Sequence, residues 1–171
     1  MKINNDIFEL GTEKAFKLLS EANKLVSKGR NIINLGIGQP DFRTPTHIVD
    51  AGIKALKDGK HGYTDSLGLI SLREEISKNL YERHQVQISP EKIVILPGGK
   101  PTIFFALLLF GGKDKEIIYP DPGFPIYESL IKYSGATPIP IKLNKKNNFD
   151  YLADEIISKI SDKTNLIIIN S

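Results

Sequence analysis

The sequence predicts an α/β protein built on a mainly parallel sheet with helices on both faces. From Lys92 onward, short apolar runs alternate with segments of helical periodicity, as in successive strand–helix–strand units. The apolar runs are near-continuous, as expected for strands that are buried on both faces. The strands expected in this part are residues 93–96, 116–119, 137–141 and 165–169, and the expected helices are 102–110, 125–133 and 151–159.

The N-terminal segment is expected to begin with an amphipathic helix. Residues 12–28 place apolar side chains such as Phe16 and Leu19 on one stripe, and Gly29 follows as a helix end. Residues 31–35 predict a short strand that runs into a loop rich in glycine and proline.

Two more helices are expected before Lys92. Thr44 stands where an N-cap is expected and Pro45 where the first helical residue is, and this helix should end near Gly59. The next helix carries apolar residues at helical spacing from Leu69 to Leu80. The front of the chain is therefore mainly helical, ahead of the alternating part.

Composition narrows the class of protein. The chain has 171 residues, a net charge of +3 and no cysteine, so disulfides and thiolate metal sites are excluded. Acidic and basic residues are interspersed, which gives no reason to expect a nucleic-acid partner. The longest apolar run, Ile103 to Phe110, is too short to cross a bilayer, which takes about 20 residues. We expect a cytoplasmic protein with no membrane partner.

The last residues, "TNLIIINS", predict a strand, and ligands of open α/β sheets lie just beyond the carboxyl ends of such strands. A sheet that finishes on a strand without a covering helix is incomplete, so we expect the sequence to be a fragment. The run is uncharged and high in β-propensity, which predicts poor solubility for the chain alone.

The stretch "PGGKPT" has the features of an anion-binding turn. Gly98 and Gly99 allow positive φ and close backbone approach, and Pro101 suits a first helical turn. Free N–H groups near Gly99 and Lys100 would bind an anion together with the helix dipole. A simple tight turn is the alternative. A P-loop nucleotide hydrolase is not supported, because Val94 and Pro101 stand where its glycine and hydroxyl residue would be.

Two further loops carry candidate binding residues. "LGIGQPDF" holds Gly36 and Gly38 but lacks the third glycine of a dinucleotide fingerprint, so a Rossmann interpretation is rejected. "YPDPGFPIY" presents Phe124 and Tyr127 after a strand; Phe124 could stack on a flat ring, or both rings could belong to the core.

Taken together and in this order, four stretches resemble the N-terminal half of class I/II aminotransferases, which are pyridoxal 5′-phosphate enzymes of the type I fold. The stretches are "NLGIGQPDFRTP", "HGYTDSLGLISLREEIS", "ILPGGKPTIFFALL" and "YPDPGFPIYESLI". The resemblance covers Ile32 to Ser171. It implies that residues 1–45 belong to an N-terminal helix and small-domain segment, and residues 46–171 to the first part of the large cofactor-binding domain.

The resemblance also implies roles for five residues. The backbone amides of Gly99 and Lys100 would hold the cofactor phosphate, and Phe124 would stack on the pyridine ring. Gly38 would contact the substrate carboxylate, and Tyr63 would reach the phosphate bound by a neighbouring subunit. A homodimer acting on an amino acid and a 2-oxo acid is therefore implied.

The family's Schiff-base lysine, its pyridine-pairing aspartate and its carboxylate-binding arginine have no counterpart in these residues, so no catalytic residue is assigned. His47, His61 and His84 are scattered without metal-ligand spacing, so no metal is expected. Lys100 is not the Schiff-base lysine. Without such a lysine base the chain alone should not transaminate. Two alternatives stay open: a lyase of the same fold that also uses pyridoxal phosphate, and a non-catalytic remnant that acts as a binding module.

Overall fold

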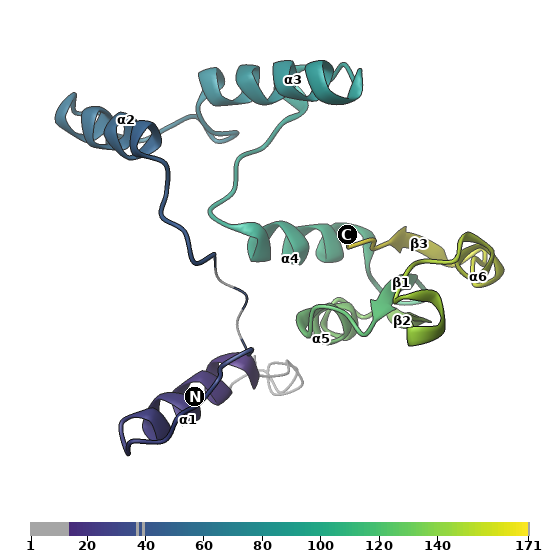
Figure 1. Cartoon of the computed structure of the whole chain (residues 1–171). Coiled ribbons are helices and arrows are strands. Elements are labelled where there is room, and N and C mark those ends of the chain that lie inside the picture. Colours follow the sequence, from purple (N-terminus) through teal and green to yellow (C-terminus); the bar gives the residue numbers. More distant parts are fainter. Residues whose placement is uncertain (1–13, 37, 39, 171) are drawn as a thin grey trace, which may run out of the picture. The chain divides into compact units, whose positions relative to one another are not determined.

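The computed structural model describes residues 14–36, 38 and 40–170, with side chains from residue 17 onward (Figure 1). The chain divides into two compact units, one formed by residues 1–37 with 99–171 and the other by residues 38–98.

The first unit contains a three-stranded parallel sheet in the order β2-β1-β3 (Figure 1). Its strands are β1 (Glu116–Asp121), β2 (Thr137–Lys142) and β3 (Thr164–Ile167). Ile118 of the central strand lies opposite Ile139 on one side and Ile167 on the other. The parallel α/β sheet predicted from the near-continuous apolar runs is confirmed.

Helices accompany the strands of this unit in chain order. They are α1 (Lys14–Val26), α4 (Gly99–Phe110), α5 (Ile126–Tyr133) and α6 (Ala153–Ser158), and the 3₁₀ turn η3 (Lys145–Asn147) lies between β2 and α6. Side chains from α4, α5 and β1, with Ala136 just before β2, form the core, which comprises Leu107, Ile117, Tyr119, Tyr127, Ile131 and Ala136. Burial of these apolar residues is what holds α4 and α5 on the sheet.

The second unit contains α2 (Thr46–Lys57), α3 (Ile70–His84) and the 3₁₀ turn η2 (Pro90–Lys92). None of its described apolar side chains is fully buried; the buried residue in this unit is Arg73, at 6% exposure. Hydrogen bonds rather than a hydrophobic core therefore connect its segments.

Three local predictions were wrong. Residues 93–96 are extended but lie outside the sheet, because the Ile95 N–H donates to the Leu67 carbonyl, at 2.9 Å, in a loop rather than in a strand. Residues 31–35 form no strand, and Ile33 and Leu35 are largely exposed. Thr44 is not an N-cap: α2 begins at Thr46, and Pro45 occupies the capping position without a side-chain bond.

Candidate functional site

The turn before α4 has the local geometry expected of an anion site. Gly98 has a φ of +94°, which favours glycine, and α4 begins at the next residue, Gly99. Gly98, Gly99 and Lys100 are exposed, and the first turn of α4 holds no acidic residue. The Gly98 N–H donates to the Leu96 carbonyl at 2.9 Å, and the positive end of the α4 dipole lies at this exposed turn.

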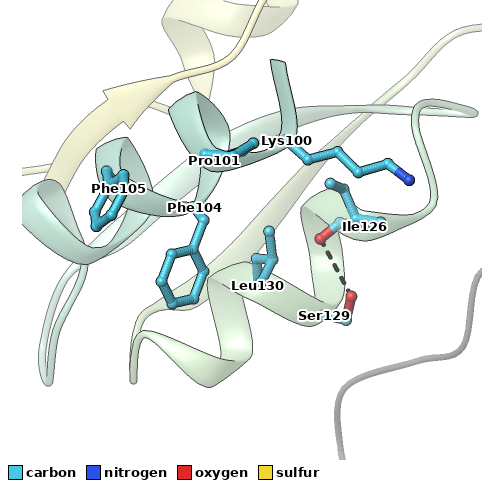
Figure 2. Close-up of a pocket in the computed structure, with 7 residues that line it drawn as sticks. All are labelled: Lys100, Pro101, Phe104, Phe105, Ile126, Ser129 and Leu130. Atoms are coloured by element: carbon cyan, nitrogen blue, oxygen red, sulfur yellow. Dashed lines mark hydrogen bonds between the residues drawn. The ribbon is translucent and has the colours of Figure 1, made fainter. Parts of the chain in front are cut away.

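An apolar hollow of about 600 Å³ lies beside this turn (Figure 2). α4 contributes Lys100, Pro101, Phe104 and Phe105, and α5 contributes Ile126, Ser129 and Leu130. The Ser129 hydroxyl is turned inward along its own helix, where it donates to the Ile126 carbonyl at 3.2 Å. Lys100 and Pro101 therefore lie both in the first turn of α4 and on the edge of a mainly apolar surface.

Phe124 lies in the loop that connects β1 to α5. Its ring is half-buried against the core and meets Tyr127 edge to face, with 5.8 Å between ring centroids. Gly123 permits this loop, because a Cβ there would lie 2.3 Å from the Pro120 carbonyl oxygen. The two aromatic residues singled out in this loop therefore differ in burial. Tyr127 is buried in the core, and Phe124 is only half-buried at its margin.

Two contacts at the carboxyl ends of the strands were missed by the sequence reasoning. The Lys142 amine at the end of β2 pairs with the Asp121 carboxylate at the end of β1. The Tyr151 hydroxyl donates to the Asn170 carbonyl at 3.0 Å and accepts from the Asn170 N–H at 2.9 Å. The first pair could have been found, since both residues are the first charges after apolar strands; the second has no signal in the sequence.

The phenol pKa is raised at two buried tyrosines of this unit, Tyr119 and Tyr127. Burial raises the pKa of Tyr119, and the negative charges of Glu128 and Asp121 raise it further. Burial also raises the pKa of Tyr127, with a smaller effect from Tyr151. Both phenols therefore stay neutral at physiological pH and act as polar members of the core.

Gly38 and Tyr63 belong to the other unit. The Tyr63 side chain is fully exposed in the loop between α2 and α3. Gly38 is exposed, and a Cβ built on it would meet no described atom within 4 Å. Gly99, Lys100 and Phe124 thus share one unit, and Gly38 and Tyr63 share the other.

Residues 14–36, 38 and 40–170 contain neither a cluster of metal-ligating side chains nor a helix suited to cross a membrane. No three metal-ligating side chains gather there. In the same described part of the chain, no helix combines the length and the apolar character that crossing a membrane requires.

A three-stranded parallel sheet with helices packed on it, in a unit whose helix α4 begins at an exposed glycine turn, defines an α/β protein. The family model described as aminotransferase class I and II matches residues 30–171. The chain belongs to the class I and II aminotransferase family, and the resemblance seen in the sequence is confirmed.

Individual relatives agree with this membership. The chain is 40% identical over 154 residues to a (5-formylfuran-3-yl)methyl phosphate transaminase of Methanocaldococcus jannaschii, covering 90% of this chain and 40% of the relative. It is 28% identical over 171 residues to an aspartate aminotransferase of Bacillus subtilis, covering 100% and 44%.

Solved structures show the same fold. A Methanococcus jannaschii protein described as similar in its active site to kynurenine aminotransferases has a TM-score of 0.84 at 36% identity, over 99% of this chain and 44% of that one. The Thermus thermophilus aspartate aminotransferase with maleate has a TM-score of 0.93 at 22% identity, over 100% and 45%. The chain thus spans less than half the length of the relatives it matches.

Proposed function

We propose that this chain contributes the phosphate, ring and carboxylate contacts of a pyridoxal 5′-phosphate-dependent aminotransferase that moves an amino group between an amino acid and a 2-oxo acid. The observation that carries the proposal is the exposed Gly98–Gly99–Lys100 turn at the start of α4, in a chain matched to this family over residues 30–171.

The residues present fit this cofactor. Its phosphate needs N–H donors and positive charge, and the first turn of α4 supplies both. Its pyridine ring needs a flat apolar neighbour, and Phe124 at the margin of the core supplies one. When bound, the cofactor acts as an electron sink for the bond that breaks at the substrate Cα.

The chain's own residues would act by binding and orientation. The amides of Gly99 and Lys100 would hold the phosphate, and Phe124 would fix the plane of the ring. The exposed backbone of Gly38 would receive the substrate carboxylate. Tyr63, fully exposed, would donate to the phosphate bound by a second copy of the protein, so a homodimer is part of the proposal.

Relatives favour transamination over the lyase alternative. The Methanocaldococcus jannaschii relative is named as a transaminase and the Bacillus subtilis relative as an aspartate aminotransferase. The identity of the amino acid, the proposed division into small- and large-domain segments at residue 45 and the cytoplasmic location stay predictions.

The test uses pyridoxine 5′-phosphate and pyridoxine, which lack the aldehyde and so do not react with exposed lysines. Both are titrated into the purified chain, with binding followed by the fluorescence of its 6 tyrosines, since it has no tryptophan. We expect the phosphate ester to bind at least about tenfold more tightly, since charge-assisted bonds to phosphate strengthen binding. Equal binding of the two compounds, or binding of neither, would contradict the proposal.

The matched variants are Gly99→Pro and Gly52→Pro. The first removes one N–H at the turn, and the second disturbs a helix in the other unit. Loss of phosphate preference is expected for the first variant and not for the second.

A further inference from the structure

Arg73 of α3 is a buried charge with a specific set of partners. Its side chain is 7% exposed. The Nε–H donates to the Gly68 carbonyl and an Nη1–H to the Pro90 carbonyl, each at 3.1 Å. The Nη2 lies 3.9 Å from an Asp65 carboxylate oxygen.

The two carbonyl bonds are what hold this guanidinium. A buried arginine cannot lose its proton, so its burial is tolerated only where its donors are satisfied. The Asp65 carboxylate is 62% exposed and at the limit of ion-pair distance, so water screens it. The planar fork of arginine reaches carbonyls of two separate segments at once, which a lysine amine does less well.

The first of these segments is the turn Asp65–Gly68. The Gly68 N–H donates to the Asp65 carbonyl, and the Leu67 N–H to the Asp65 carboxylate, each at 2.8 Å. Gly68 has a φ of +93°, and a Cβ there would lie 2.6 Å from the Ile95 Cβ. The Leu67 carbonyl in turn accepts from the Ile95 N–H at 2.9 Å. The turn is thus held between Arg73 and Ile95.

The turn Asp65–Gly68 and the segment that runs from Pro90 through Ile95 both lead to residues of the proposed site. Tyr63 precedes Asp65 by two positions, and Ile95 precedes Gly98 by three. We propose that Arg73 is a positioning residue: by bonding Gly68 and Pro90 it fixes the Tyr63 loop and the segment that enters the glycine turn. This role in the site rests on the proposed function.

The direct test is amide hydrogen exchange, measured by NMR on the whole chain. In Arg73→Met we expect the amides of Gly68 and Ile95 to exchange at least about tenfold faster, while amides inside α3 change little, because only the turn loses its support. Arg73→Lys should behave like Arg73→Met, since one nitrogen cannot replace the fork. Unchanged rates at Gly68 and Ile95 would overturn the proposal, and so would a uniform rise through α3 or wild-type rates in Arg73→Lys.

Ser77→Ala is the matched control. The Ser77 hydroxyl donates to the Ile88 carbonyl at 2.5 Å, so it also ties α3 to the segment before η2, but it does not reach the Asp65–Gly68 turn. The rates at Gly68 and Ile95 should be unchanged in this variant. A rise equal to that in Arg73→Met would show that any loosened contact of α3 has the same effect, and would overturn the specific role.

Titration with pyridoxine 5′-phosphate separates this inference from the proposed function. Arg73→Met should weaken its binding about tenfold and leave pyridoxine unaffected, if the glycine turn needs this support. If the wild-type chain binds neither compound, the proposed function fails, and the exchange rates still decide whether Arg73 holds the turn. Faster exchange with unchanged phosphate binding would overturn the role in the site.

Discussion

At Tyr119 and Tyr127, burial disfavours the phenolate and so links the stability of the sheet-bearing unit to alkaline pH. Both pKa values are raised above the ordinary 10.0. Below that value both states of the chain keep their protons, and the contribution to stability is complete. Above it the unfolded chain loses protons that the folded chain retains, so stability falls as pH rises through 10.0 toward the folded pKa.

We therefore predict that Tyr127→Phe makes stability less dependent on alkaline pH. The measurement is the urea midpoint of unfolding at several values between about pH 8 and pH 11, compared with wild type. Tyr81, at 53% exposure, provides the control Tyr81→Phe, which should keep the wild-type slope. An unchanged slope in Tyr127→Phe, after correction for its stability at pH 8, would contradict the argument.

Among the helices, the stability of α5 should depend mainly on the burial of one side chain, Ile131. Ile131 is fully buried against the core, on a helix of eight residues that is too short to be stable by itself. Ile157 of α6 is a similar residue with 63% exposure.

Ile131→Ala should lower the free energy of unfolding by about 2–5 kcal/mol, because the lost methylenes leave a cavity. Ile157→Ala should change it by less than about 0.5 kcal/mol. Denaturant titrations of both variants measure the difference. Similar losses in the two would show that α5 does not depend on core packing.

Strands were predicted well where the run of apolar residues indicated burial in a sheet. The run that became β1 is buried at residues 117–120 in succession, as expected for a strand covered on both faces, whereas β3 has exposed positions at Asn165 and Ile167. Residues 93–96 have the same composition, yet Ile95 bonds to a loop carbonyl instead. An apolar run predicts an extended segment; whether it has a strand neighbour depends on residues elsewhere in the chain.

The candidate site shows the same limit. Gly98, Gly99 and Pro101 are local signals for a turn and a helix start, and the structure has both there. Arg73 gives no such signal, because its partners Gly68 and Pro90 are brought to it only by folding. The roles of Gly38, Tyr63, Gly99, Lys100 and Phe124 in binding stay predictions.

At the scale of the whole molecule, β3 leaves one edge of the sheet open in the described structure. The Ile168 N–H donates to the Ile118 carbonyl at 2.8 Å. Alternate residues of a parallel strand bond to opposite sides, so the backbone groups of Ile167 and Ile169 face away from β1. Their side chains are 37% and 65% exposed, and the run from Thr164 to Asn170 carries no charge.

We predict that the chain associates with itself through this edge. Light scattering on a size-exclusion column should give a mass that rises with concentration, and Ile169→Lys should lower it, because a charge on an edge strand opposes pairing. Ile157→Lys adds the same charge away from the sheet and should leave association unchanged. A monomer at every concentration would contradict this prediction, as would equal effects of the two variants.

The strand order also has a consequence during protein synthesis. β1 lies at the centre of the sheet, yet both of its neighbours, β2 and β3, come later in the chain. A ribosome therefore releases the strand that ends most deeply buried before either of its neighbouring strands has been made. Ile117 and Ile118, which end fully buried, remain accessible to chaperones until Thr164 and the residues after it have been translated.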